Sequence, residues 1–280
     1  MTSQASGSEL ALDPTAPKVA APVGIFFLLT FLVTWACWIP VVRRLRPGTP
    51  ASSALWLLGV FAPSLVALAL TAWYEGTSSA KALLGRIVQW KVGGRWYLFA
   101  LSYMVVIKLA VAVVHRLALG SWPRFGHEGP AVILIAILVS TPVQAGEEMG
   151  WRGYALPRLA KRMGFARASL LIGVVWAGWH LPQFFLRGAD TYGQSFPIWS
   201  LEVIAMSVAI TWLYTHTNGS VLLPMLMHSA INNTKDIVPS GAANATNAFS
   251  VHASSVLYLT AGLLWITAAY FLIRMPNRTK

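Results

Sequence analysis

Eight stretches of this 280-residue chain are apolar enough, and nearly all long enough, to cross a lipid bilayer as helices. An α-helix rises about 1.5 Å per residue, so roughly 20 apolar residues span the hydrocarbon core. Because the core holds no water, the backbone of each stretch must satisfy its own hydrogen bonds, which favours helices. The sequence therefore predicts an all-α, polytopic membrane protein, a bundle of about eight transmembrane helices. The expected spans are residues 21–42, 53–74, 96–118, 131–150, 168–186, 197–215, 220–236 and 253–274.

The segments outside the spans are short and complete a simple domain plan. The chain is 56% hydrophobic and only 11% charged, which is more apolar than a soluble domain requires. Residues 80–92 carry apolar side chains at helical spacing after a polar cluster, which predicts an amphipathic helix in the membrane interface. Residues 1–18 are predicted to be a disordered leader, 19–274 a single transmembrane domain and 275–280 a C-terminal tail.

The net charge of +12 is explained by membrane topology and not by nucleic-acid binding. The basic residues occupy short loops, and no basic helix face or aromatic-interleaved patch is present in the sequence. Thirteen of them fall on the side of the predicted spans that holds both termini, against seven on the other side. The positive-inside rule then predicts cytoplasmic termini in the plasma (inner) membrane of a bacterium, with membrane lipid as a partner.

Two adjacent glutamates, Glu147 and Glu148, end the fourth predicted span. Ionisable groups in hydrocarbon cost several kcal/mol unless they are paired or hydrated, so each requires a partner. On a helix Glu148 and Arg152 are four residues apart and share a face, whereas Glu147 is rotated by about 100°. Arg152 is thus expected to support Glu148 and to leave Glu147 free, although both glutamates could instead only form salt bridges at the membrane boundary.

Two histidines lie within other predicted spans, each on a helix face with a second notable residue. Trp176 precedes His180 by one turn in the segment WAGWH, and Asn232 follows His228 by one turn in HSAIN. A lone histidine on an apolar face is usually a satisfied core residue. Two histidines, an asparagine and an unpaired glutamate at membrane depth instead favour a shared hydrated cavity.

A carboxylate and an imidazole near neutral pH can bind and deprotonate water. One interpretation makes Glu147 the general base with His180 as its partner, while His228 and Asn232 stabilise the oxyanion. A second makes Glu147, His180 and His228 the ligands of a catalytic divalent metal such as zinc. Cys37 is the only cysteine, so thiolate clusters are excluded, and the sequence leaves the metal-dependent and metal-free alternatives open.

The elements EEMGWR, WAGWH and HSAIN resemble the three ordered motifs of the CPBP family of intramembrane proteases, also called the abortive-infection family. This family includes the type II CAAX prenyl endopeptidases and the bacteriocin-processing and immunity-linked proteins. The resemblance covers about residues 80–235 and implies an intramembrane endopeptidase acting on a membrane-associated or lipidated peptide or protein. It implies a catalytic set of Glu147, His180, His228 and Asn232, supported by Glu148, Arg152 and Trp176. Trp176 departs from the family pattern, in which phenylalanine is commoner.

Two other functions compete with the protease. Buried glutamate and histidine also serve as proton relays in transporters, but the sequence has no inverted repeat or matching pair of broken helices. A non-catalytic scaffold or immunity protein could keep the same fold, although the intact polar set favours catalysis.

Two further ionisable residues within the spans are predicted to have structural roles. Glu202, near the start of the sixth span, complements a helix dipole. Lys108 is expected to extend toward the membrane surface or to form an interhelical hydrogen bond.

Overall fold

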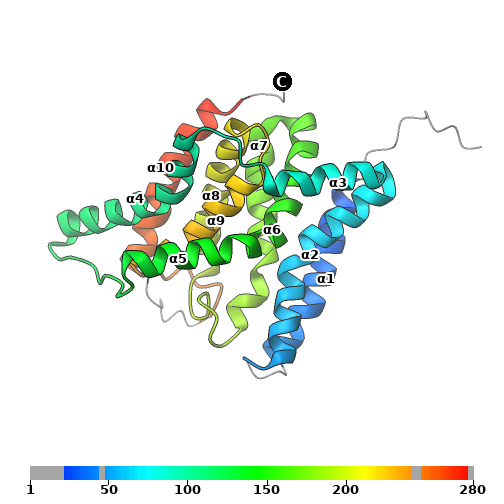
Figure 1. Ribbon diagram of the computed structural model, residues 1–280. Helices are drawn as coiled ribbons and strands as arrows, with labels where there is room; N and C mark the ends of the chain where they lie inside the picture. The colour runs from blue at the N-terminus through cyan, green and yellow to red at the C-terminus, as the bar shows by residue number, and fades with distance from the viewer. Residues whose placement is uncertain (1–21, 44–47, 241–246, 277–280) are drawn as a thin grey trace, which may run out of the picture.

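The computed structural model describes residues 22–43, 48–240 and 247–276, and every regular element within them is helical (Figure 1). The prediction of an all-α, polytopic membrane protein is confirmed. The predicted leader, residues 1–18, and residues 277–280 of the predicted tail lie outside the described residues. The elements are α1 (Val23–Arg43), α2 (Pro50–Glu75), α3 (Thr77–Gly85), η1 (Arg86–Val88), α4 (Gly94–Leu119), α5 (Pro130–Ser140), η2 (Thr141–Gln144), α6 (Ala145–Glu148), η3 (Met149–Ala155), α7 (Leu156–Trp179), η4 (Leu181–Phe185), α8 (Phe196–His216), α9 (Leu222–Thr234), η5 (Lys235–Ile237) and α10 (Ser255–Arg274).

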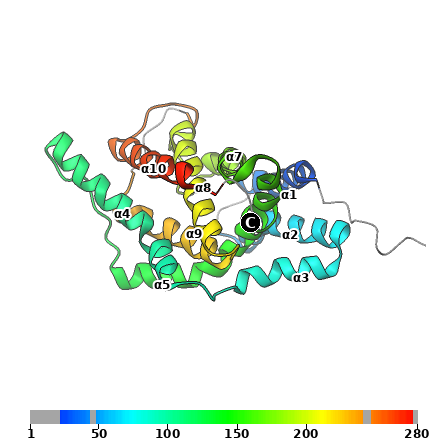
Figure 2. The same ribbon diagram turned by 90° about the horizontal axis from the view of Figure 1, so that it is seen from above.

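Six helical runs in the described residues are long and apolar enough to cross a membrane. They contain seven of the eight predicted spans, because the run Pro130–Phe185 holds two of them. The eighth predicted span corresponds to α9, which is only 13 residues long. Seen from above, α7, α8 and α9 lie between the α1–α2 pair and the α4–α10 pair (Figure 2). The central helices are therefore those that carry both predicted histidines.

The fourth predicted span, residues 131–150, is not one continuous α-helix. α5 ends just before Pro142, whose ring and missing N–H break the helical hydrogen bonds. The hydroxyls of Ser140 and Thr141 each donate a hydrogen bond of 2.7 Å to a carbonyl four residues earlier. A 3₁₀ turn, a single α-turn and the π-helix η3 then follow. Short π-helical segments occur frequently at functional sites, and both glutamates lie immediately before this one.

Glycines hold α6 and η3 close to α2. A Cβ atom at Gly150 would lie 2.6 Å from the Cβ of Pro63, and one at Gly146 would lie 3.0 Å from the carbonyl oxygen of Val60. The hydroxyl of Ser64 adds a hydrogen bond of 2.5 Å to the carbonyl of Ala145. Small residues spaced by four allow such close helix approach within membranes, and here they fix the segment that carries Glu147 and Glu148.

The predicted amphipathic segment is helical: α3 and η1 lie across the end of the bundle at which α1 begins and α10 ends (Figure 1). Leu83 is buried, whereas Leu84 and Val88 are exposed. Arg86 donates a hydrogen bond of 3.0 Å to the Tyr214 hydroxyl, and its carbonyl accepts one of 3.0 Å from the backbone N–H of Val221. The segment thus ties α8 and α9 together, while its location in a membrane interface stays a prediction.

Candidate active site

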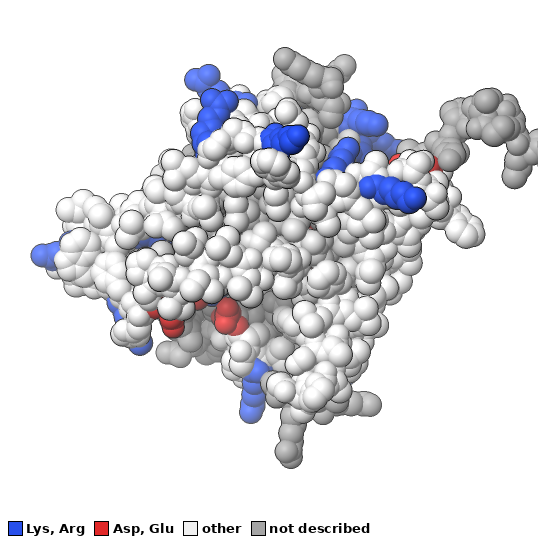
Figure 3. Space-filling view, in the orientation of Figure 1, with Lys and Arg blue, Asp and Glu red and all other residues white. Residues whose placement is uncertain are grey.

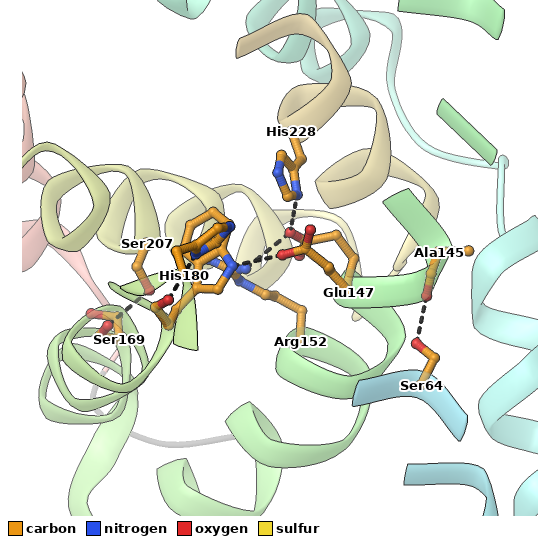
Figure 4. A network of polar contacts seen from close by, with 10 residues as sticks. Ser64, Ala145, Glu147, Arg152, Ser169, His180, Ser207 and His228 are labelled. Atoms are coloured by element: carbon orange, nitrogen blue, oxygen red, sulfur yellow. Dashed lines mark hydrogen bonds and ion pairs between the residues drawn. The ribbon is translucent and has the colours of Figure 1, made fainter. Parts of the chain in front are cut away.

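A cavity of about 550 Å³ opens between the central helices and contains all four residues predicted to be catalytic. Glu147 comes from α6, His180 from the end of α7, and His228 and Asn232 from α9. In Figure 4 the side chains of Glu147, His180 and His228 approach one another from these separate elements, with Arg152 beside them. The fold therefore brings together residues up to 85 positions apart in sequence, counted from Glu147 to Asn232.

Glu147 is buried, with 6% of its surface exposed, and it accepts a hydrogen bond from a tryptophan. The indole Nε1–H of Trp176 donates to Glu147 Oε2 over 2.7 Å. The same indole lies 4.6 Å from the Arg152 guanidinium and 5.1 Å from the His228 ring, measured between centres. The sequence predicts a supporting role for Trp176 beside His180 but not this bond to Glu147. The identity of the residue was the available clue, because phenylalanine at this position would have no N–H to donate.

Glu148 is fully buried, and one of its carboxylate oxygens contacts both a guanidinium and an imidazole. Its Oε1 accepts hydrogen bonds from Arg152 Nη1 at 2.9 Å and from His228 Nδ1 at 2.8 Å. The contact with Arg152 is the one expected from their spacing. The contact with His228 differs from the sequence-based expectation, in which both histidines face Glu147. With its Nδ1 proton held by the carboxylate, a neutral His228 has Nε2 as its remaining acceptor.

His180 is held by its own helix and not by Glu147. Its Nδ1 lies 2.8 Å from the carbonyl oxygen of Trp176, so this nitrogen carries a proton and Nε2 is the acceptor in the neutral ring. The rings of Trp179 and Trp199 pack edge-on against it, at 4.6 and 5.2 Å between centroids. The expected direct pairing of Glu147 with His180 is replaced by an indirect one, because Trp176 contacts both residues.

Asn232 lies one turn beyond His228, lines the same cavity and is exposed. Its neighbour Asn233 has a structural role instead, donating hydrogen bonds to the Ser140 hydroxyl at 2.9 Å and to the Ser229 carbonyl at 2.8 Å. Of the two adjacent carboxamides, only Asn232 is therefore available to a molecule in the cavity.

The zinc alternative requires three donors grouped closely enough to coordinate one ion. In the described part of the chain, no group of three or more His, Cys, Asp or Glu side chains has that arrangement. One ring nitrogen of His228 is bound to Glu148, and one of His180 to a carbonyl. Nε2 of both rings stays free, so the spacing of Glu147, His180 and His228, and not the bonding of their nitrogens, is what does not fit a metal site in the described geometry.

Comparison with known proteins agrees with the family resemblance of the three sequence motifs. Residues 127–234 match the sequence model of the family described as type II CAAX prenyl endopeptidase Rce1-like. The matched segment is therefore similar to this family of peptidases. A similar protein, CAAX prenyl protease 2 of Methanococcus maripaludis, is 26% identical over 239 residues, covering 76% of this chain and 84% of the relative. The Rce1-like segment contains all seven residues that the sequence assigned to the site, and the predicted resemblance to this family is confirmed.

Proposed function

We propose that this protein is an intramembrane endopeptidase that hydrolyses a peptide bond of a membrane-associated or lipidated peptide or protein. The observation that carries the proposal is the convergence of Glu147, His180, His228 and Asn232 on one cavity inside an apolar bundle. Similarity to a peptidase family supports the same conclusion. The name of the Methanococcus relative suggests prenylated CAAX proteins as one substrate class, and exported or immunity-linked peptides are the other.

In the proposed mechanism Glu147 is the general base. It removes a proton from a water molecule as the water oxygen attacks the carbonyl carbon of the scissile bond. The bond from Trp176 fixes the orientation of the carboxylate, and the acceptor Nε2 of His180 holds the water. The negative charge that develops on the carbonyl oxygen is stabilised by hydrogen-bond donors that the fold holds in position in the cavity.

Asn232 and His228 are the proposed oxyanion donors. The carboxamide of Asn232 donates directly, and an imidazolium ring at His228 would donate through Nε2 while its Nδ1 stays bound to Glu148. Arg152 holds Glu148 in place through a salt bridge of 2.9 Å. The proton taken up by Glu147 then passes to the leaving amine as the carbon–nitrogen bond breaks, which returns the carboxylate to its starting state.

We also propose that residues 19–274 form one transmembrane domain with 80–235 as its catalytic core, in the plasma membrane of a bacterium. The end of the bundle that carries α3 and most of the visible Lys and Arg side chains is placed in the cytoplasm (Figure 3). This orientation puts both termini in the cytoplasm.

The test is cleavage of prenylated CAAX-type peptides and of leader-type peptides by the purified, reconstituted protein. Glu147→Gln is expected to reduce the rate by about 100-fold or more, the range for loss of a general base. His180→Ala and His228→Ala should also lower it strongly. Glu128→Gln is the matched control, because Glu128 is an exposed glutamate that does not line the cavity. If wild type and Glu147→Gln cleave the peptides at equal rates, Glu147 is not the general base and the proposed mechanism is wrong. If wild type cleaves none of the peptides, the alternative functions of a non-catalytic scaffold or a transporter are favoured.

A further inference from the structure

A second pocket, distinct from the catalytic cavity, lies at the end of the bundle that carries α3 and is called the basic pocket below. It has a volume of about 620 Å³, and in the described structure it shares no lining residue with the catalytic cavity. Its walls come from the segment between η1 and the start of α4 and from the end of α8 with the turn that follows. A pocket of this size suits a small molecule or a lipid headgroup. None of the residues in the mechanism above lines it, so a different role must account for it.

Hydrogen bonds hold the two walls of the basic pocket together. Gln89 Nε2 donates to the backbone carbonyl of Asn218 at 3.3 Å, and the Ser220 hydroxyl donates to the carbonyl of Gln89 at 2.8 Å. Within the first wall, the Tyr97 hydroxyl donates to the Trp90 carbonyl at 2.7 Å. The pocket is therefore preformed, and a ligand that fits it does not first have to order these segments.

The basic pocket carries positive charge that is not neutralised. Lys91 lines it, and the guanidinium of Arg95 stacks on the lining ring of Trp96, 4.8 Å from the ring centre. Both cationic residues are exposed. Among the described residues, no carboxylate oxygen lies within 4.0 Å of either side chain, and no Asp or Glu lines the pocket. The electrostatics of the pocket therefore favour an anionic ligand.

Three aromatic side chains, those of Trp90, Trp96 and Tyr97, give the same pocket apolar walls. They flank Gly94, the first residue of α4, which is one of the helices long and apolar enough to cross a membrane. Tryptophan and tyrosine concentrate at the headgroup level in membrane-spanning proteins. A ligand that matches both the aromatic walls and the cations has a charged group next to an apolar part.

The remaining polar side chains of the basic pocket provide uncharged hydrogen-bonding groups. His216 Nδ1 lies 2.8 Å from the carbonyl oxygen of Trp212, so this nitrogen carries the proton of the neutral ring and Nε2 is the acceptor. Asn218 is exposed, and its carboxamide offers both a donor and an acceptor. Hydroxyl groups on a ligand suit both residues.

We propose that the basic pocket binds the headgroup of an anionic glycerophospholipid. The phosphate lies beside Lys91, the headgroup hydroxyls contact His216 and Asn218, and the glycerol and the upper acyl chain pack on Trp90 and Trp96. Basic pockets between transmembrane helices are established sites for anionic headgroups. The bound lipid joins the segment after η1 to the turn before α9, the helix that carries two of the predicted catalytic residues. It stabilises this junction whether or not the protein is a peptidase.

The experiment measures lipid binding to the full-length protein purified in detergent, so the result does not depend on catalysis. Thermal unfolding is followed while phosphatidylglycerol, phosphatidylcholine or water-soluble glycerol 3-phosphate is added. Wild type is expected to bind phosphatidylglycerol about tenfold or more tightly than phosphatidylcholine, and glycerol 3-phosphate should not stabilise it at the same concentration. Lys91→Met should lose this preference, and Lys91→Arg should keep most of it. Lys81→Met is the matched control and should keep all of it, because Lys81 is an exposed lysine of α3 outside the pocket lining.

Three outcomes would overturn the proposal. Equal affinity of wild type for the two lipids would show that the pocket does not select an anionic headgroup. Equal loss of the preference in Lys91→Met and Lys81→Met would assign it to the overall positive charge of this end of the bundle. Stabilisation by glycerol 3-phosphate as strong as that by phosphatidylglycerol would identify a soluble phosphate ester, and not a lipid, as the ligand. The two comparisons made with wild type are decisive even where a variant does not fold.

Discussion

At the scale of single residues, two adjacent carboxylates have different neighbours and therefore different chemistry. Glu148 binds a guanidinium and an imidazole through one oxygen and lies outside the cavity lining. Among the described contacts, Glu147 has one hydrogen bond, from the indole N–H of Trp176, and it lines the cavity. A carboxylate held by a cation is a poor base, whereas one held by a neutral donor keeps its negative charge available. The structure thus supports Glu147 as the reactive group and Glu148 as the residue that orients His228.

Trp176→Phe tests the role of the indole N–H. The phenyl ring keeps the contacts with Arg152 and His228, but it removes the hydrogen bond to Glu147, and bonds to charged groups contribute about 1.5–3 kcal/mol. We expect kcat/KM to fall about tenfold, mainly through kcat, with little change in thermal stability. Steady-state kinetics and a melting curve in detergent provide both measurements. Trp199→Phe is the control, because its contact with His180 is made through the ring.

An unchanged kcat in Trp176→Phe would contradict a positioning role for the N–H. Phenylalanine is commoner at this position in the resembling family, so the variant should fold and retain measurable activity. A complete loss of activity would also count against the proposed role, since it would indicate a structural defect and not the loss of one hydrogen bond.

At the scale of elements, the site depends on a helix that is broken and then widened. Pro142 ends α5, and η3 adopts π-helical geometry after the glutamates. On the opposite side of this segment, Gly146 and Gly150 leave room for α2. The two features act together, since the irregular turns set the direction of the carboxylates and the glycines set their depth in the bundle.

Gly150→Ala tests this packing. The new methyl group would lie 2.6 Å from the Cβ of Pro63 and 2.7 Å from its backbone, and overpacking of this kind costs about 1–3 kcal/mol. We expect a lower midpoint of thermal unfolding and reduced activity. Gly262→Ala is the matched control, since nothing lies within 4 Å of a Cβ at this helical position, and it should not destabilise the protein. A Gly150→Ala variant as stable as Gly262→Ala would show that α2 can move away at no cost.

Local rules explain which parts of this architecture the sequence could predict. Hydropathy located the spans, and a spacing of four predicted the Glu148–Arg152 contact, because both depend on neighbours in the chain. The bond between Glu148 and His228 joins residues 80 positions apart, and no local rule chooses between the two glutamates. The same limitation applies to Lys108, whose burial depends on how α4 packs against α10.

At the scale of the whole molecule, charge and cavity lie at opposite ends. The end that carries α3 also holds the start of α1, the end of α10 and most of the visible basic side chains (Figures 1 and 3). The cavity lining extends the other way, to the loop after η4 and to the residues that follow α9, where Asp190 and Asp236 are exposed. If the basic end is cytoplasmic, the substrate enters from the opposite side of the membrane, as an exported peptide would.

Cysteine labelling of intact cells tests this orientation directly. The chain has a single cysteine, the buried Cys37, so Cys37→Ala gives a background without thiols. In that background Arg187→Cys, at an exposed position near the cavity mouth, is expected to react with a membrane-impermeant maleimide in intact cells. Lys161→Cys, at an exposed position of the basic end, should react only after lysis. The reverse pattern would place the cavity mouth in the cytoplasm, within reach of lipidated cytoplasmic proteins, and would exclude the exported-peptide route. Labelling thus shows on which side of the membrane the cavity opens, and this decides between exported peptides and lipidated cytoplasmic proteins before any substrate is identified.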